Sequence, residues 1–459
     1  MNPDERRSEE RSEGLDGELE LKPPTSNPIR VDPRPSAPAS PSVEQHARAA
    51  REASRRIAIA RTNTKNHLLT ELAAAVESHA PQILAANARD MAAAAQAAMP
   101  SPKLKRLELS PQSLAHMAES LRAVAALPDP VGAITRDELR PSGLRVRKVR
   151  APLGVIAMIY ESRPAVTIDA FALCFKAGNA CILKGGKEAA HSNAALAAIV
   201  RETLLAHDLP DSAIASISTA SRDDLRELLQ LNHCIDLVIP RGGVELIEFV
   251  VGHSTIPTIQ HFQGICHIFV DESADVDMAV EVCATAKTSA PATCNAAECI
   301  LVHKSIADRF VPRMIERFAR DGVEVRGTPL IQALAGDAGS VRLAEAEDFG
   351  REFLDLIVAM RTVDSVEEAI DHIATYGSNH TESILTRDLG PGGSGERFSA
   401  AVQSSCVLIN ASTRFNDGFS LGLGAEIGIS TSRIHAYGPM GLEELTTQRW
   451  VVEGNGQCR

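Results

Sequence analysis

Residues 153–184 read LGVIAMIYESRPAVTIDAFALCFKAGNACILK, and this stretch decides the fold class. An apolar run at 153–159 is followed by a helical segment near 165–176 and by a second apolar run at 180–184. Short apolar strands separated by helices are typical of a parallel sheet that is covered on both faces. The stretch therefore predicts an α/β fold.

The same alternation continues toward the C-terminus. Apolar runs at 214–218 and 235–240 are separated by a helical segment that begins near residue 223, and another helix is expected from residue 188. A second α/β unit is expected beyond them. Its strands are predicted at 266–270, 298–303 and 353–360, and its helices near 275–288 and 305–320.

The N-terminal side has a different composition. Residues 1–42 are rich in proline and lack aromatic residues, so we expect a disordered tail there. Two or three helices should follow, and Ser110 with Pro111 has the pattern of an N-cap and a first helical residue. The basic segment 143–150 is too polar for a buried strand and would suit an edge strand or an arm, and a protruding hairpin at about 133–151 is one interpretation.

Length and charge narrow the class of protein. The chain has 459 residues, which at about 150 residues per domain indicates roughly three structural units. Its net charge of -12 disfavours nucleic acid as a partner, since phosphates would be repelled. The charged N-terminus does not have the pattern of a signal peptide, and no apolar run has the length of a membrane span. The nine cysteines, an odd number, fit a reducing compartment, so we expect a soluble, cytoplasmic protein.

The strongest candidate for chemistry is the segment SAPATCNAAE at 289–298, in which Cys294 lies in a loop between a predicted helix and a predicted strand. A substrate can reach a cysteine in such a loop. Backbone N–H groups of the loop would favour the nucleophilic thiolate and could hold an oxyanion. The alternative is a buried, unreactive thiol. Cys294 with Cys299, or Cys266 with His267, lacks the paired CxxC spacing of a zinc site, so no metal is predicted.

Two glycine pairs follow predicted strands. Gly242 and Gly243 lie at a strand-to-helix turn, where backbone N–H groups could hold phosphate. Gly185 and Gly186 follow the strand that ends at Lys184. Neither pair matches GxGxxG, and many such turns need glycine only for its backbone freedom. A dinucleotide site is therefore one of two open interpretations.

Taken together, these segments resemble the gamma-glutamyl phosphate reductase family, a divergent branch of the aldehyde dehydrogenase superfamily. The resemblance runs from about residue 45 to the end of the chain. It is carried by segments that occur in the family's order. They are PLGVIAMIYESRP (152–164), KAGNACILKGGKEA (176–189), IDLVIPRGG (235–243), GICHIFVDESADVDMA (264–279), AKTSAPATCNAAE (286–298), EFLDLIVAM (352–360), NASTRF (410–415) and GLGAEIGISTSRIHAYGPMGLEELT (422–446).

The resemblance implies a domain plan. A Rossmann-like NADP-binding domain is expected at 43–262, including the oligomerisation hairpin, and an α/β catalytic domain at 263–425. The C-terminal segment, 426–459, should return to the cofactor domain and contribute to oligomerisation.

The resemblance also implies site residues. It places the catalytic thiol at Cys294, with Asn295 beside it in the motif, and Arg163 where ordinary superfamily members carry an asparagine. The remaining implied residues are those that hold the cofactor. They are Lys184, Gly185 and Gly186 for the adenosine end, with Lys184 able to meet an NADP 2′-phosphate, Gly242 and Gly243 under the pyrophosphate, and Glu352 at the nicotinamide ribose.

The implied reaction is the NADPH-dependent reduction of gamma-glutamyl phosphate to glutamate 5-semialdehyde through a thioester on Cys294. A fixed charge at Arg163 suits a phosphorylated substrate. The water-activating glutamate of hydrolytic relatives is absent, because its motif has become QGICH at 263–267. A phosphate-supplying glutamate 5-kinase is expected as a separate protein, and the chain is expected to form homo-oligomers.

Other interpretations remain open. The chain could oxidise a small aldehyde to an acid, which requires a water-activating carboxylate near the cysteine. It could also be an inactive nucleotide-binding scaffold. Arg163, Arg241, Arg414 and Glu161 are candidates for binding the substrate's α-carboxylate and α-amino groups, and each could instead form structural ion pairs.

Overall fold

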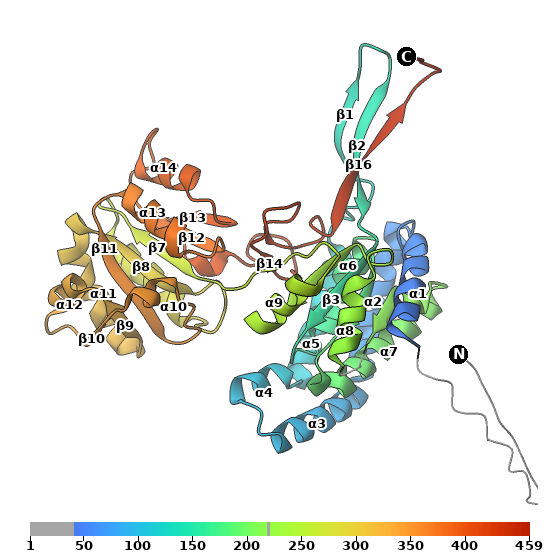
Figure 1. The fold of residues 1–459 in the computed structure, drawn as a ribbon, viewed down its shortest axis with the longest axis horizontal. Helices are drawn as coiled ribbons and strands as arrows, with labels where there is room; N and C mark the ends of the chain where they lie inside the picture. Colours follow the sequence, from blue (N-terminus) through green and yellow to red (C-terminus); the bar gives the residue numbers. More distant parts are fainter. Residues whose placement is uncertain (1–40, 218–220) are drawn as a thin grey trace, which may run out of the picture. The chain divides into compact units, whose positions relative to one another are not determined.

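The computed structural model describes residues 41–217 and 221–459 (Figure 1). The predicted tail, 1–42, lies outside the described residues except for its last two positions. Ser42 is described, and its hydroxyl accepts a hydrogen bond from the N–H of Gln45 at the start of the first helix. No helix in the described ranges combines the length and the apolar character needed to cross a bilayer.

From residue 41 onward, five helices precede the first strand, where two or three were predicted. Ser110 caps the fifth as expected, and Pro111 is its first residue. The alanine-rich sequence concealed the boundaries, because small apolar residues on every face weaken the amphipathic period. The helices are α1 (Val43–Ile57), α2 (Thr62–Ser78), α3 (Ala80–Gln96), α4 (Ser101–Leu107) and α5 (Pro111–Ala126).

A four-stranded parallel sheet confirms the alternation from which the fold was predicted. Its order is β5-β4-β3-β6, and α2, α5, α6 and α7 pack on one face while α1, α8 and α9 pack on the other. The elements are β3 (Val155–Tyr160), α6 (Val166–Lys176), β4 (Ala180–Lys184), α7 (Ala190–Ala206), β5 (Ile214–Ser216), α8 (Arg222–Gln230), β6 (Leu237–Arg241) and α9 (Val244–His253).

A seven-stranded parallel sheet forms the second α/β unit, in the order β10-β9-β11-β8-β7-β12-β13. Helices α10, α11 and α12 cover one face, and α13 and α14 cover the other. The strands are β7 (Cys266–Val270), β8 (Ala297–His303), β9 (Glu324–Gly327), β10 (Val341–Leu343), β11 (Ile357–Val363), β12 (Thr381–Leu385) and β13 (Cys406–Ile409). The helices are α10 (Val276–Thr288), α11 (Ala307–Asp321), α12 (Pro329–Ala335), α13 (Val366–Tyr376) and α14 (Ser394–Ala401).

The strand predicted at 353–360 was placed too early. Leu354 has a φ of 54°, a left-handed conformation that a strand cannot contain, and β11 starts only at Ile357. Phe353 and Leu356 pack against the cores on opposite faces of the sheet, whereas Leu354 is exposed, and none of the residues 353–356 pairs in the sheet.

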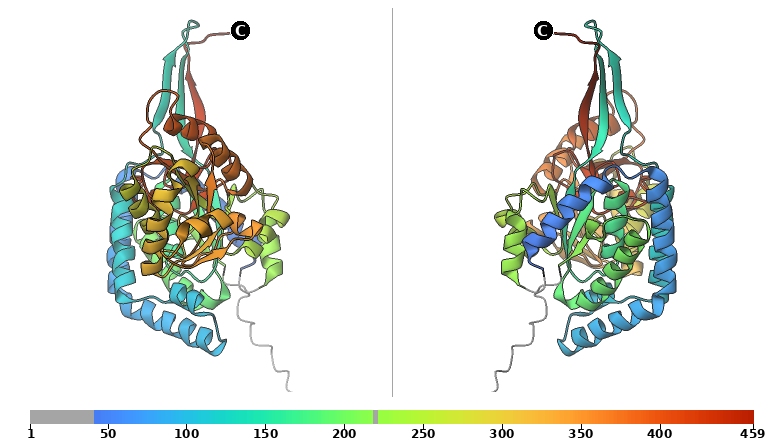
Figure 2. Two further views of the ribbon diagram at one scale, coloured as in Figure 1. Left: turned by 90° about the vertical axis from the view of Figure 1, so that its left-hand side faces the viewer. Right: turned by 90° about the vertical axis from the view of Figure 1, so that its right-hand side faces the viewer.

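The predicted hairpin is present, but its basic strand is central rather than at an edge. A separate antiparallel sheet has the order β1-β2-β16, formed by β1 (Ile134–Leu139), β2 (Arg145–Pro152) and β16 (Thr446–Glu453) (Figure 2). The basic side chains of β2 are tolerated there because acidic groups lie on both sides. Arg145 pairs with Asp137, and Arg147 with Glu453.

The hairpin sheet also carries Trp450, on β16. Its side chain is half exposed, and the cationic groups of Arg136 and Lys148 lie 5.7 and 5.5 Å from its ring centre. These cation–π contacts shield part of the ring. A short two-stranded sheet, β14 (Ile429–Ser430) with β15 (Gly438–Pro439), precedes β16 in the chain.

Candidate active site

Cys294 lies in the loop 289–296, which joins the end of α10 to the start of β8, as the sequence predicted. Its side chain is partly exposed. Six of the other cysteines in the chain are buried, which leaves Cys294, Cys406 and Cys458 with solvent-accessible surface. Accessibility alone does not single out Cys294, so the case depends on its surroundings.

The backbone of Cys294 is held against the segment that leads into β7. A Cβ atom built on Gly264 would lie 1.9 Å from the Cys294 carbonyl oxygen, so only glycine fits at position 264. The Cys266 thiol donates a hydrogen bond of 3.2 Å to the same oxygen. The motif QGICH (263–267) contains no carboxylate. Two of its residues, Gly264 and Cys266, contact the backbone of the Cys294 loop instead.

Asn295 anchors the other side of the loop. Its amide nitrogen donates to the carbonyl oxygens of Asn416, at 3.0 Å, and Arg414, at 3.4 Å. Arg414 in turn donates to the Thr293 hydroxyl at 2.9 Å. Both N–H donors of Asn295 are thus used within the protein, and the side chain of Arg414 also holds the loop.

The ionisation of Cys294 differs from the sequence-based expectation. Burial raises the pKa of its thiol to about 11, although the positive charge of Arg241 and a backbone N–H of the loop act in the opposite direction. The negative charges of Glu352 and Glu426 raise it further. Without ligands the cysteine is therefore mostly protonated at neutral pH, because loss of hydration outweighs the favourable contacts.

Two arginines contribute positive charge beside this thiol. Arg163 follows β3, and Arg241 ends β6 and lies against Gly428, where a Cβ would meet a guanidinium nitrogen. Among described residues, no carboxylate oxygen lies within 4.0 Å of either guanidinium. Restricted hydration and the charges of Arg241 and Arg106 lower the pKa of Arg163 to about 10, so it keeps its charge at neutral pH. The alternative that Arg163 forms a structural ion pair with Glu161 has no support in the described residues.

Two carboxylates, those of Glu352 and Glu426, raise the pKa of the thiol. The sequence analysis identified only Glu352. Glu352, on the segment that follows the short turn 346–350, accepts a hydrogen bond from the N–H of Gly264 at 2.9 Å. Glu426 accepts one from the N–H of Gly418 at 2.9 Å. Burial raises the pKa of both carboxyls. The only signal for Glu426 in the sequence was a lone acid in the glycine-rich stretch GLGAEIG, which by itself is uninformative.

The end of β4 places Lys184 as predicted, with Gly185 and Gly186 after it. The Lys184 ammonium donates to the Gly185 carbonyl at 3.2 Å, and burial lowers its pKa. A Cβ on Gly185 would collide with the side chain of Asn193 at 2.1 Å. The lysine thus keeps two donors for a ligand, while glycine at 185 is explained by packing.

The second predicted turn is crowded at Gly242, where a Cβ would lie 2.6 Å from the side chain of Leu246, and open at Gly243. Gly243 is the N-cap of α9, and a Cβ built there would meet nothing within 4 Å. Its N–H donates to the Glu161 carboxylate at 3.2 Å. An anion therefore already lies at this helix N-terminus, and a diphosphate at the same place would have to displace Glu161.

A buried histidine–cysteine group lies outside this site. Side-chain atoms of His267, Cys299 and His372 that could ligate a metal lie within 4.8 Å of one another. Burial alone would lower the pKa of His267, but Glu382, 3.2 Å from its Nδ1, and Cys299 raise it to about 10. An imidazolium at His267 balances the buried charge of Glu382, and Arg361, 3.4 Å from His372, adds further positive charge.

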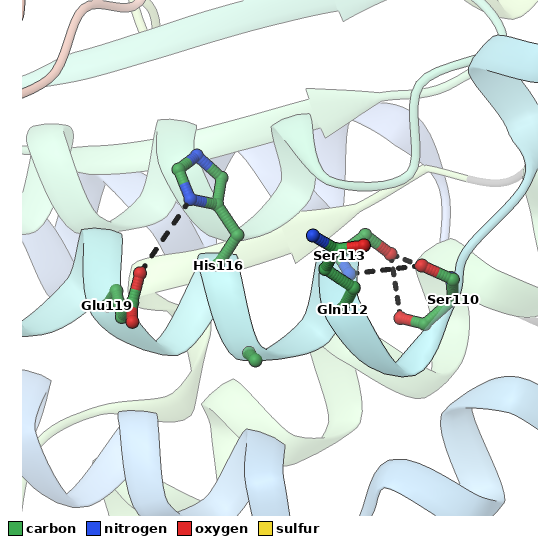
Figure 3. A pocket seen from close by; sticks show the side chains of 6 residues that line it. Ser110, Gln112, Ser113, His116 and Glu119 are labelled. Atoms are coloured by element: carbon green, nitrogen blue, oxygen red, sulfur yellow. Dashed lines mark hydrogen bonds and ion pairs between the residues drawn. The ribbon is translucent and has the colours of Figure 1, made fainter.

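A surface hollow lies elsewhere, on the N-terminal half of α5 (Figure 3). Ser110 and Ser113, which line it, bond one another in the cap of that helix. His116 and Glu119 lie 4.0 Å apart on the same helix. None of the predicted site residues lines this hollow, whose lining consists of a helix cap and exposed polar side chains, so we assign it no chemistry.

Comparison with known proteins identifies the class. The family model described as "Aldehyde dehydrogenase family" matches residues 25–330, and the chain belongs to this family. The predicted superfamily and α/β fold class are thereby confirmed, and a nicotinamide cofactor follows from the family.

Individual similar proteins share a more specific name than that of the family. A protein of Nitratidesulfovibrio vulgaris (strain DP4) named gamma-glutamyl phosphate reductase is 52% identical over 417 residues, which are 91% of this chain and 98% of that protein. One of Xylella fastidiosa (strain 9a5c) with the same name is 51% identical over 409 residues, 89% of this chain and 97% of that protein. The crystal structure of gamma-glutamyl phosphate reductase from Thermotoga maritima superimposes with a TM-score of 0.88 at 41% identity and covers 91% of this chain and 100% of that one.

Proposed function

We propose that this chain reduces gamma-glutamyl phosphate to glutamate 5-semialdehyde and inorganic phosphate with NADPH, the second step of proline biosynthesis from glutamate. The observation that carries the proposal is the Cys294 thiol on a fixed loop, beside the charges of Arg163 and Arg241, neither of which pairs with a carboxylate among described residues. Relatives about half identical over most of their length carry the corresponding name.

Cys294 acts as the nucleophile. Its sulfur bonds to the acyl carbon of the substrate, the bond from that carbon to the phosphate oxygen breaks, and inorganic phosphate leaves. The protonated thiol of the free chain must lose its proton for this step. A phosphorylated substrate brings basic phosphate oxygens to the thiol, and they can accept that proton as phosphate departs.

Arg163 and Arg241 bind the anionic ends of the substrate. A guanidinium can bind two phosphate oxygens in parallel, and such charge-assisted contacts are about twice as strong as neutral hydrogen bonds. Arginines already paired with carboxylates could not do this without breaking those pairs. We therefore assign the transferred phosphate to Arg163 and the second anionic group to Arg241.

The residues present fit the nicotinamide cofactor. Lys184 offers N–H donors to the 2′-phosphate, the pyrophosphate would replace the Glu161 carboxylate at the N–H of Gly243, and Glu352 could accept from the nicotinamide ribose. When bound, the cofactor supplies the hydride that reduces the thioester. The role of the chain is to hold the acyl group on Cys294 and to keep the loop still during this step. When the aldehyde leaves, the sulfur departs as a thiolate, which takes a proton from solvent to regain the thiol.

Aldehyde oxidation is the second candidate, because Glu352 and Glu426 act on Cys294 and either could activate water. One oxygen of each carboxylate is held by a backbone N–H. The reverse assay separates the two functions. The protein is given glutamate 5-semialdehyde and NADP, with and without inorganic phosphate, and NADPH is followed by absorbance.

The proposed reductase forms NADPH only when phosphate is present and releases gamma-glutamyl phosphate. Equal rates without phosphate, with glutamate as the product, would establish the hydrolytic aldehyde dehydrogenase instead. No NADPH in either arm, from a folded protein that binds NADPH, would favour the inactive scaffold.

Cofactor preference and assembly complete the proposal. We propose that NADPH is preferred over NADH because the ammonium of Lys184 keeps N–H donors for a 2′-phosphate, and Lys184→Gln should reduce this preference. The antiparallel sheet β1-β2-β16 exposes Leu139, Trp450 and Val452 and leaves both of its edge strands unpaired in the described chain. We propose that a second copy covers it. We also propose a cytoplasmic location and a separate glutamate 5-kinase as the source of the substrate.

A further inference from the structure

A buried ion pair closes the base of the catalytic loop. Lys287 is the penultimate residue of α10, and Glu298 is the second residue of β8. Their side chains meet at 2.6 Å between Nζ and Oε2, and neither side chain is exposed to solvent. The loop that carries Cys294 therefore leaves and re-enters the fold between two residues that are joined through their side chains.

The same pair also holds the segment that carries Glu352. The second carboxylate oxygen of Glu298 accepts a hydrogen bond from the N–H of Leu354 at 3.3 Å. Leu354 has a φ of 54°, which is costly for a leucine and is kept only where surrounding contacts impose it. Two residues earlier, Glu352 bonds Gly264, which supports the Cys294 carbonyl. A connected path thus runs from Glu298 through Leu354, Glu352 and Gly264 to the nucleophile.

The ion pair is costly to maintain. Burial raises the pKa of Glu298 and lowers that of Lys287, so each side chain needs the other to keep its charge. Replacing such a pair by apolar or neutral groups of similar shape is often neutral for stability. Stability therefore gives no sufficient reason for this pair, whereas its place at both ends of the catalytic loop is explained by positioning.

We propose that Lys287 and Glu298 are positioning residues. They fix the Cys294 loop and the Glu352 segment relative to each other, so that the nucleophile and the residue that contacts the cofactor are placed together. The inference rests on the proposed function for its kinetic consequence. The structural part stands without it, because the position of Cys294 can be measured by its own reactivity.

The test uses the double variant Lys287→Met/Glu298→Gln in the full chain. Methionine and glutamine preserve most of the volume, and glutamine can still accept from Leu354. A misplacement of about 1 Å at a reacting group can cost on the order of 10²-fold in rate. We expect kcat of the phosphate-dependent reaction to fall at least tenfold, while KM for the semialdehyde changes little. The rate of Cys294 alkylation by iodoacetamide should also change several-fold.

A matched control comes from another buried pair. Lys65, fully buried on α2, lies 2.9 Å from Asp129, outside the catalytic loop. Lys65→Met/Asp129→Asn makes the same kind of change and should leave kcat and Cys294 alkylation at wild-type values, whatever it does to Tm. Rescue is also expected, since Lys287→Arg keeps the charge and should retain more activity than Lys287→Met.

Two results would overturn the inference. One is wild-type kcat and wild-type alkylation in Lys287→Met/Glu298→Gln. The other is an equal loss in the control pair, which would indicate a general effect of removing buried charge. If the wild-type chain lacks phosphate-dependent activity, the proposed function fails, yet the alkylation rates and the control still decide the positioning role.

Discussion

The loop that carries Cys294 and the turn at Gly242 and Gly243 are built in opposite ways. The loop is held by Gly264 and Cys266 at its carbonyl and by Asn295 at its side. The turn has open space in front of Gly243, and one carboxylate on its N–H. Covalent chemistry requires a fixed nucleophile, whereas a diphosphate needs N–H donors whose present partner, here Glu161, can be displaced. Substitutions in the loop should therefore affect rate most, and those in the turn should affect binding.

The most severe test removes the nucleophile. Cys294→Ala should lower turnover by more than about 10³-fold, as removal of a nucleophile does in other enzymes. Thermal stability and NADPH binding should persist, because the loop is held mainly by backbone and neighbouring side chains. Cys406→Ala, at another partly exposed cysteine, is the control and should stay active. Turnover that survives in Cys294→Ala would show that the thiol is not the nucleophile.

The next test disturbs the loop without touching its chemistry. In Gly264→Ala the new methyl group would lie 1.9 Å from the Cys294 carbonyl, so the loop must move. We expect a loss on the order of 10²-fold in kcat, since small displacements of reacting atoms are costly. Gly252→Ala, where a Cβ would meet nothing within 4 Å, is the matched control. Steady-state kinetics with circular dichroism distinguish displacement from unfolding, and equal kcat for the two variants would contradict close support of the loop.

Substitution of Arg163 tests whether its positive charge binds the phosphate. Arg163→Gln should weaken charge-assisted phosphate binding by about 2 kcal/mol or more, which is over tenfold in phosphate-dependent rate. The apparent affinity for phosphate in the reverse reaction is the measurement. Arg163→Lys keeps the charge but cannot bind two oxygens in parallel, so its apparent affinity for phosphate should lie between those of the wild type and Arg163→Gln. If Arg163→Gln binds phosphate as wild type does, another group is the phosphate ligand.

The turn is tested by adding a charge in its open space. Gly243→Asp places a carboxylate at an N-cap, where aspartate is a good residue, so Tm should change little. It should weaken NADPH binding by about tenfold through repulsion of the pyrophosphate. Gly243→Asn adds nearly the same shape without the charge and is the control. Calorimetric titration with NADPH is the measurement, and equal affinities for the two variants would place the pyrophosphate elsewhere.

The smallest expected effect concerns the acidity of the thiol. Because the pKa of Cys294 is raised to about 11, its alkylation by iodoacetamide should accelerate about tenfold per pH unit through pH 7 to 10, as the thiolate fraction grows. Arg241→Gln removes a charge that lowers this pKa and should slow alkylation several-fold at fixed pH. Glu352→Gln should act in the opposite direction. A rate that levels off near pH 8 would show an ordinary or lowered pKa.

Local sequence patterns predicted the scaffold well. The strands at 180–184 and 266–270 were located to the residue, because a short apolar run bounded by polar residues leaves little choice of ends. The strand at 353–360 was misplaced because Phe353 and Leu356 are packed outside the sheet, while Leu354 between them is exposed and left-handed. A left-handed leucine has no local signal, since contacts with distant residues impose it.

The site was only partly predictable for the same reason. Cys294 and the glycine turns belong to contiguous motifs, so the sequence identified them. Glu426 and Gly264 act on Cys294 from separate segments, and their proximity exists only after folding. The raised pKa of the thiol had no signal either, because burial depends on the whole neighbourhood rather than on the loop that carries the residue.

The hairpin sheet gives the chain an intrinsic optical reporter. Trp450 is the sole tryptophan among 459 residues, so the emission excited at 295 nm comes from this sheet alone. Its ring is half exposed in one copy, with cationic side chains nearby. Burial by a second copy would move the emission to shorter wavelength as the protein is concentrated. Dissociation could then be followed by dilution, without any label and without substrate.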